Sequence, residues 1–479
     1  MNTPLTGRID GSPRAVLDEQ ILRPQFAHEA ARLLPHYIAA ERALVDEYHR
    51  MGVLSETDCA DLHAALVALG AAGISPDAAA NFSDVAFAIE TGVNSRLGRT
   101  VAGWHVDRSR NDLQATAQRM YARERIDAIS ASVAGLAAVT LDRAQEYLTD
   151  PLPGQTHLQA AQVISPAFFL SALAEELLDT LDTLAAARDL VDRCPLGAGA
   201  MAGGDLPWDR RKLATALGFA RPARHALGAV ASRHWVLALT AALSNFGVTL
   251  SRFTTDLMGW GSGPVGYLWL PDDLAGISSA MPQKRNYPVL ERIRGRTAHL
   301  TACYLDAALG QRNTTYTNLV EVSKEASALL PTALDAAGSV LALATTVISS
   351  FRLDTERAAA DAGAEFLGAF SLANRLTLDH GIGWREAQVI SGRYVVAALE
   401  QGVAPGRAGV TLLSDALTGA GHPLPHRILE SLLDNAFDPV AALAAKVTEG
   451  GTSPVRVLEL IQLIRRDLAD RTAPRGGPS

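Results

Sequence analysis

Apolar residues along the centre of the chain recur with the period of an α-helix. One run contains apolar positions separated by three or four residues: Trp235, Leu239, Leu243, Phe246, Leu250, Phe253 and Leu257. This spacing places them all on one helical face. Proline, which interrupts helix interiors and central strands, is absent between Pro222 and Pro264 and between Pro288 and Pro331. Strand-like alternation is scarce, so the pattern predicts an all-α fold built on long helices.

Segments rich in glycine and proline divide the chain into three predicted helical regions. Such segments occupy residues 195–207 and 259–288, and they typically break helices. We expect an N-terminal helical region over residues 1–105, a central long-helix bundle over 106–355 that carries the loop 259–288, and a small helical region over 356–479. Several central faces are apolar enough to need partners on more than one side, which a homo-oligomer would supply.

Composition places the chain among ordinary globular proteins and argues against several kinds of partner. The 479 residues are 48% hydrophobic and 20% charged, and 43 basic against 51 acidic residues give a net charge of −8. This slightly acidic balance gives no indication of a basic surface that would bind nucleic acid or an anionic membrane. The three cysteines have neither metal-ligand nor disulfide spacing. The sequence has no signal-like start and no uncharged apolar run of about 18 residues, so we expect a cytoplasmic protein that needs no metal.

The loop around Ser278 is the strongest candidate for chemistry. Residues 276–286 read GISSAMPQKRN, with two hydroxyls, a lysine and an amide immediately before a predicted long helix. Backbone N–H groups and the dipole at a helix start favour an anion, and Lys284 adds a full positive charge. The same field would help a hydroxyl of the loop to act as a base. The alternative interpretation is a solvated surface loop that only caps the following helix, because such loops have the same composition.

Two further segments carry polar groups ahead of predicted helices. His157 lies in a polar turn, PGQTHLQ, and histidine is the side chain whose proton moves near neutral pH. Residues 105–112 read HVDRSRND, and Arg108 and Arg110 within them could bind carboxylates bidentately. Considered one at a time, His157 is equally consistent with a structural role, and Arg108 and Arg110 are equally consistent with a solvent-exposed helix face.

Together these segments resemble the fumarase/aspartase superfamily, and within it the argininosuccinate lyase family. The loop SSAMPQKRN is similar to the signature GSSxMPxKxNP, and Gln283 is the residue typical of the argininosuccinate branch. HVDRSRNDL at residues 105–113 resembles HTGRSRNDQ, GQTHLQAAQ at 154–162 resembles GYTHLQxAQ, and PLGAGAMAG at 195–203 resembles PLGSGALAG. The matches keep the same order along most of the chain.

The resemblance implies an enzyme that eliminates fumarate from an N-substituted aspartate, a small dicarboxylate, without a metal or organic cofactor. It gives Ser278 as the catalytic base, and His157 as a second proton-transfer residue with Glu291 as its carboxylate partner. Lys284 and Asn286 would hold a substrate carboxylate. The other substrate-binding positions that it implies are Ser109, Asn111, Thr156, Gln283 and, more loosely, Arg108 and Tyr316. Active sites in this family are shared among three subunits of a homotetramer whose long helices form the central core.

The sequence departs from the family pattern mainly near the amine part of the substrate. Glu41 stands where the family has serine, Glu321 where it has glutamine, and Leu319 where it has aspartate. Two additional carboxylates would suit a more cationic leaving group if both face the pocket. Three hypotheses stay open: argininosuccinate as the substrate, a different amine or another elimination of the superfamily, and a catalytically silent structural tetramer.

Overall fold

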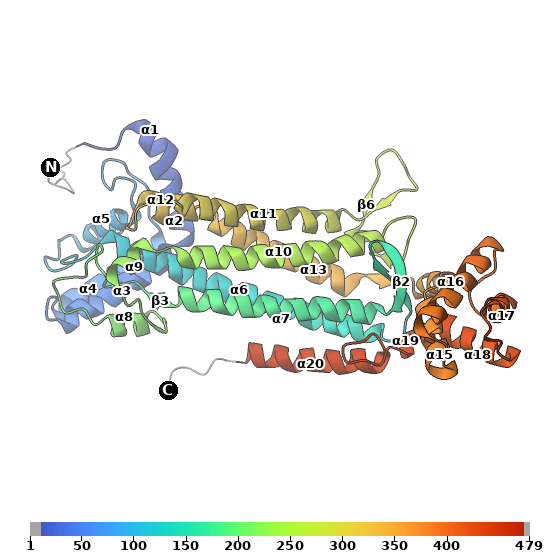
Figure 1. The fold of residues 1–479 in the computed structure, drawn as a ribbon. Coiled ribbons are helices and arrows are strands. Elements are labelled where there is room, and N and C mark those ends of the chain that lie inside the picture. Colours follow the sequence, from blue (N-terminus) through green and yellow to red (C-terminus); the bar gives the residue numbers. More distant parts are fainter. Residues whose placement is uncertain (1–10, 474–479) are drawn as a thin grey trace.

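Five long helices lie side by side and form the body of the molecule (Figure 1). The computed structural model describes residues 11–473. The helices of the bundle are α6 (Arg110–Glu146), α7 (Pro166–Val191), α10 (His234–Trp260), α11 (Pro288–Gln311) and α13 (Leu330–Ser350). The prediction of an all-α fold with a central long-helix bundle is therefore confirmed.

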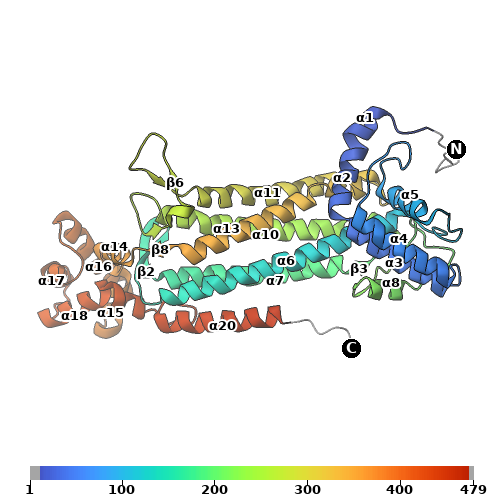
Figure 2. The same ribbon diagram turned by 180° about the vertical axis from the view of Figure 1, so that it is seen from behind.

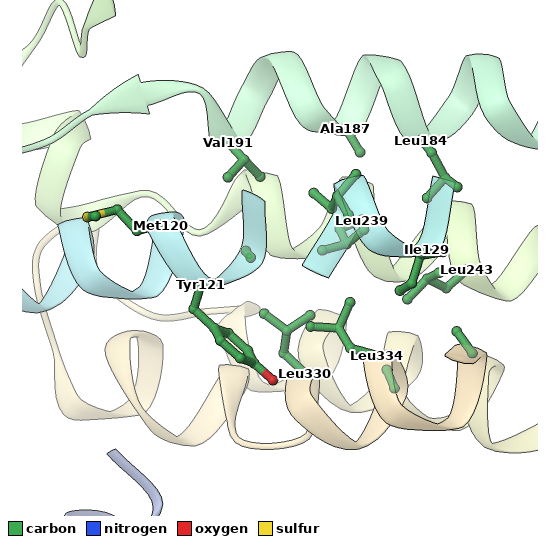
Figure 3. Close-up of a cluster of buried hydrophobic side chains, with 14 of the residues drawn as sticks. Met120, Tyr121, Ile129, Leu184, Ala187, Val191, Leu239, Leu243, Leu330 and Leu334 are labelled. Atoms are coloured by element: carbon green, nitrogen blue, oxygen red, sulfur yellow. The ribbon is translucent and has the colours of Figure 1, made fainter. Parts of the chain in front are cut away.

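The bundle core is built from the apolar stripes that the sequence shows. Of the seven apolar positions counted on α10, all are buried except Phe253, which is partly buried. In Figure 3, side chains from α6, α7, α10 and α13 meet in one cluster that includes Ile129, Leu184, Leu239 and Leu334. Each such side chain stabilises the fold by roughly 1.5–3 kcal/mol. Gly247 lets α10 approach α11, because a Cβ there would lie 3.0 Å from the carbonyl oxygen of Thr297.

The N-terminal region forms a group of helices at one end of the bundle (Figure 2). Its elements are α1 (Ala15–Leu17), the π-helical turn η1 (Asp18–Leu22), α2 (Arg23–Arg32), α3 (Leu34–Arg50), α4 (Glu56–Ala72) and α5 (Val85–Leu97). Buried residues of this region, such as Tyr48, Leu62 and Ile89, belong to the same hydrophobic core as the bundle. The region is thus packed onto the bundle rather than independent of it.

Short elements connect the long helices at both ends of the bundle. Near the N-terminal region lie β3 (Arg193–Cys194), α8 (Arg210–Ala216), β4 (Arg221–Pro222), α9 (Ala226–Ala231), α12 (Val320–Ser323) and η3 (Glu325–Ser327). At the opposite end lie β1 (Leu152–Thr156), β2 (Gln159–Ile164), β5 (Leu268–Trp269), η2 (Asp272–Leu274), β6 (Gly276–Ile277), β7 (Arg285–Asn286) and β8 (Arg352–Leu353). The pairs β1–β2, β5–β8 and β6–β7 are antiparallel, and β3–β4 is parallel.

The C-terminal region begins as a separate cluster and ends on the bundle. Its elements are α14 (Thr355–Ala364), α15 (Ala369–His380), α16 (Trp384–Glu400), η4 (Arg407–Gly409), α17 (Val410–Gly419), α18 (His426–Phe437), α19 (Pro439–Ala444) and α20 (Pro454–Thr472). Helices α15 to α18 enclose a core of their own. Helix α20 instead runs back along α6 and α7 (Figures 1 and 2), and its Val457 and Ile461 join the bundle core.

Within residues 11–473, two helical segments are long and apolar enough to cross a membrane by length and composition alone. They are α10 and the segment Val320–Ser350, and 50% and 44% of their most apolar windows are buried inside the protomer. Core helices of globular proteins pass the same test, and α10 carries the buried stripe of the bundle.

Candidate active site

Ser278 lies in a hairpin that projects from the end of the bundle (Figure 1). Gly276 pairs with Asn286 at the base of this hairpin. The Ser278 Oγ accepts the backbone N–H of Met281 at 3.0 Å and that of Ala280 at 3.4 Å. Two N–H donors stabilise negative charge on the oxygen that they contact. Ile277, the neighbour of Ser278, is 93% exposed, so the protomer leaves the loop open.

His157 lies in the two-residue turn between β1 and β2. Its φ of 55° and the φ of 60° at Leu158 are both left-handed, as a type I′ turn between antiparallel strands requires. A residue other than glycine adopts this conformation at a cost of roughly 1–2 kcal/mol, and such strain tends to persist at functional positions. His157 and Thr156 are exposed, and Leu158 is 83% exposed.

The remaining candidates of the Ser278 loop line one cavity. Gln283, Lys284, Asn286 and Glu291 contribute to a cavity of about 980 Å³ at the start of α11. The N-cap residue of α11, Tyr287, makes no side-chain cap hydrogen bond, and the positive end of the helix dipole favours an anion. The geometry therefore suits a carboxylate, with Lys284 close to the helix start.

A second set of candidates surrounds the start of α6, at the other end of the bundle. The Ser109 Oγ accepts the backbone N–H of Asn111 at 3.1 Å and caps the helix. The Asn111 side chain donates to the carbonyl of Ala200 at 3.1 Å. This contact joins the helix start to the segment PLGAGAMAG, so two of the sequence segments meet here as neighbours.

Arg108 and Glu41 form a buried ion pair in this second set. Arg108 Nη1 donates to Glu41 Oε2 at 2.8 Å, Nη2 donates to Oε1, and the side chains are only 7% and 1% exposed. Burial alone would raise the pKa of the Glu41 carboxyl, but the charge and hydrogen bonds of Arg108 outweigh it and lower that pKa. In the protomer, the charges of Glu41 and Arg108 neutralise each other, and neither residue offers a free charge to a substrate. Glu41 therefore gives no support for a cationic amine, which required its carboxylate to face the substrate pocket.

Tyr316 and Glu321 lie near the same end and are open to solvent. Tyr316 is 68% exposed, and its hydroxyl would lie 3.7 Å from a Cβ placed on Gly228. Glu321 is exposed in the first turn of α12. Lys324, the lysine that the family pattern retains, donates to Glu29 Oε1 at 2.7 Å. Glu321 is therefore the additional carboxylate that stays accessible in the protomer.

The candidates thus fall into two groups. The hairpin group comprises Thr156, His157, Ser278, Gln283, Lys284, Asn286 and Glu291. The helix-start group comprises Glu41, Arg108, Ser109, Asn111, Tyr316 and Glu321. Helix α6 separates Ser109 from the strand that ends at Thr156, and its 37 residues span about 55 Å. One protomer cannot bring the two groups into a single site.

Among residues 11–473, one cluster could place three metal-ligand atoms together. Asp46, Cys59 and His63 bring their donor atoms within 4.8 Å of one another. The His63 Nε2 already hydrogen-bonds Asp46 at 2.7 Å, and Arg42 donates to its Nδ1 at 3.3 Å. A guanidinium beside the cluster opposes a cation, and the cluster lies on α3 and α4, outside both groups of candidates.

Comparison with known proteins identifies the family. A family model described as "Lyase" matches residues 64–300. An argininosuccinate lyase from Synechococcus sp. (strain JA-3-3Ab) is 33% identical over 96% of this chain and 92% of its own length. The chain belongs to the argininosuccinate lyase family. An argininosuccinate lyase from Hyphomonas neptunium (strain ATCC 15444) is 31% identical over 95% of this chain and 96% of the relative.

Solved structures confirm the fold of this lyase. EDDS lyase in complex with formate aligns with a TM-score of 0.84 at 23% identity, covering 97% of this chain and 92% of that one. A class II fumarase from Schistosoma mansoni aligns with a TM-score of 0.71 at 15% identity, over 87% and 94% of the two chains. The all-α fold is thus that of the fumarase/aspartase superfamily. With the family relationship, it makes the protein a carbon–nitrogen lyase that releases fumarate.

The sequence motifs do not show how some charges are paired. The sequence alone presents Glu41 as an additional carboxylate, because its partner, Arg108, lies 67 residues away along the chain. Glu29, which binds Lys324 and also accepts from Tyr37 at 2.9 Å, was not singled out at all. Its acidic side chain among the apolar residues of α2 was the available signal, since buried carboxylates are normally paired.

Proposed function

We propose that Ser278 is the catalytic base of an anti β-elimination that splits an N-substituted aspartate into fumarate and a free amine. The observation that carries the assignment is the pair of backbone N–H donors at 3.0 and 3.4 Å on the Ser278 Oγ, because they stabilise the alkoxide that abstracts the proton. Lys284 and Asn286 bind the carboxylate next to the carbon that loses this proton. Their position by the uncapped start of α11 supports that role.

The reaction then follows from charge development at the substrate. Proton loss builds negative charge on the carboxylate beside the carbanionic carbon, and Lys284 with the positive end of the α11 dipole stabilises that charge. The carbon–nitrogen bond breaks with its electron pair leaving on nitrogen, which is protonated. His157, with Glu291 as its carboxylate partner, serves as the second proton-transfer residue.

The proposed substrate-binding set is completed by Thr156, Ser109, Asn111, Gln283, Arg108 and Tyr316. Arg108 acts through its pair with Glu41.

The complete site is proposed to form between three subunits of a homotetramer. The two groups lie at opposite ends of a bundle whose longest helix spans about 55 Å, so other protomers must supply the missing group. Leu158 and Ile277, which flank His157 and Ser278, are 83% and 93% exposed. Both side chains are therefore available for contact with another subunit. A cytoplasmic location and the absence of a required cofactor remain expectations.

A mixing experiment tests the shared site. Ser278→Ala and Asn111→Ala change different groups, and each is expected to be inactive alone. Unfolding and refolding the two variants together should restore fumarate release, because some sites of a mixed tetramer then contain both wild-type groups. Fumarate absorbance measures the rate. Mixing Ser278→Ala with Lys284→Ala, two changes within the single hairpin of β6 and β7, is the control, because one protomer must supply both residues. Equal recovery in both mixtures would contradict a site divided between subunits.

The amine part of the substrate is the open question of this function. Argininosuccinate is the substrate of the relatives by their names, and an altered amine is the second candidate, favoured by Glu321 in place of the family's glutamine. Incubating the purified protein with argininosuccinate and following fumarate distinguishes them. We expect slow release, with kcat/KM at least about 100-fold below the value expected of a typical enzyme, roughly 10⁴–10⁸ M⁻¹s⁻¹. Rapid turnover would establish argininosuccinate as the substrate.

A further inference from the structure

A cavity rich in arginine lies beside Tyr316 at the helix-start end of the bundle. Its volume is about 420 Å³, and its lining includes Arg119, Arg193, Arg221 and Arg224. His225 and His234 also line it. Within residues 11–473, no aspartate or glutamate contributes to this lining. The wall is therefore positive, although the whole chain carries a net charge of −8.

The hydrogen bonds around the cavity leave most of this positive charge uncompensated. Asp189 is the carboxylate that binds both Arg193 and Arg221, at 2.9 Å each. Arg224 is exposed and has no recorded side-chain acceptor in the part of the chain described here. One carboxylate thus faces four guanidinium groups, and a positive potential results in the cavity.

Arg119 is the most telling member of this wall because it is buried without a carboxylate. Only 6% of the residue is exposed, and Nη1 donates to the carbonyl of Leu190 at 2.8 Å. The Arg119 Nε has no hydrogen-bond partner among the described residues, nor has the Trp235 Nε1, which lines the same cavity. Burial, then the charges of Arg233 and Arg193, lower the pKa of Arg119 to about 9. Buried charges without a partner are costly, so proteins normally pair them.

The position of the cavity relates it to the helix-start group. Arg119 lies on α6 eight residues after Asn111, a rise of about 12 Å along the helix. Tyr316, a member of the helix-start group, lines the cavity with Arg119. The Tyr316 hydroxyl faces Gly228 on α9, which also lines it. The cavity is thus next to the helix-start group, whose departures from the family pattern lie near the amine part of the substrate.

We propose that this arginine cavity binds an anionic group, a carboxylate or a phosphate, carried by the amine portion of the substrate. The inference rests on the proposed function and specifies its substrate class. Guanidinium groups bind both kinds of anion through charge-assisted hydrogen bonds. Arg224, which is exposed and lines the cavity, offers its guanidinium N–H groups to such an anion. The leaving amine accordingly carries an acidic group in addition to its nitrogen, which a polyamine lacks.

The test runs the reaction in the direction of addition. The amine nitrogen then bonds to one alkene carbon of fumarate, the other carbon takes a proton, and fumarate absorbance falls. Two matched pairs of amines are used: phosphoethanolamine with ethanolamine, and β-alanine with propylamine. Agmatine is the cationic comparison. We expect the member that carries the anionic group, in at least one pair, to react with kcat/KM about tenfold or more above the member that lacks it, and the better pair distinguishes phosphate from carboxylate.

Arg224→Gln tests the cavity itself, because this exposed side chain is the member most easily changed without unfolding. The preference for the anionic amine is expected to fall about tenfold. Arg211→Gln, which changes an exposed arginine on α8 outside the cavity, should leave the preference unchanged. Calorimetric titration with inorganic phosphate gives a readout independent of turnover, and Arg224→Gln should weaken that binding about tenfold relative to Arg211→Gln.

The outcomes separate this inference from the proposed function. If fumarate is consumed but neutral or cationic amines react as well as anionic ones, the cavity inference is wrong and the lyase assignment stands. If no amine reacts and argininosuccinate releases no fumarate, the proposed mechanism is in error, and the phosphate titration decides the cavity. Phosphate binding that is absent, or equal in Arg224→Gln and Arg211→Gln, overturns the inference.

Discussion

Replacing Ser278 with alanine is expected to lower kcat for fumarate release by about 10²–10⁴-fold, the usual contribution of a positioned general base. The Ser278 Oγ is the hydroxyl on which the N–H groups of Met281 and Ala280 converge. No other group of the hairpin inherits these two donors when the hydroxyl is removed. Because Ser278 lies in an open loop, the substitution should leave the thermal midpoint and the oligomeric state unchanged.

Ser279→Ala is the matched control for this experiment. Ser279 is the adjacent hydroxyl in the same exposed loop, and no hydrogen bond of its side chain is recorded within residues 11–473. Its loss should change kcat by less than about threefold, since it removes no group that contacts the reacting proton. Equal activity of Ser278→Ala and the wild type would exclude Ser278 as the base. A wild-type protein inactive with every amine would instead favour the silent structural tetramer.

Local sequence pattern was sufficient for the fold because it determines both the helices and their buried faces. The stripe from Trp235 to Leu257 is buried in the structure as its spacing predicts. The return of α20 onto α6 and α7 was not predictable in the same way. Its amphipathic face, with Val457 and Ile461 buried, indicates that a partner exists but does not specify which helix provides it.

The residue types of the candidate site, and its sharing between subunits, are predictions from the family motifs, whereas the placement of these residues within one protomer could not be predicted. The residues around Ser278 and around Ser109 carry the family motifs, so their types follow from the sequence. Their separation along α6 follows only from the path of the chain, which places the two groups at opposite ends of the bundle. The arginine cavity shows the same limit, because Arg119, Arg193 and Arg224 come from distant segments without a shared motif.

The ion pair between Glu41 and Arg108 leads to the second large effect. Glu41→Ala is expected to lower the free energy of unfolding by about 3–5 kcal/mol, because it leaves the buried Arg108 guanidinium without a counter-charge. We expect a loss of this magnitude because the Arg108 and Glu41 side chains are only 7% and 1% exposed. Urea unfolding at a fixed protomer concentration measures the change, since assembly contributes to apparent stability.

Asp182→Ala provides the comparison, because Asp182 and Arg471 form an ion pair whose side chains are 56% and 30% exposed. Such a pair contributes about 0–1 kcal/mol, so the two variants should differ several-fold in how much they lower the free energy of unfolding.

The result also decides what Glu41 does in this lyase. If Glu41 bound a cationic amine directly, Glu41→Ala would raise KM for that amine and leave the free energy of unfolding nearly unchanged. A large loss of stability, by contrast, assigns the carboxylate to Arg108, and the additional negative charge at position 41 then gives no reason to expect a cationic leaving group.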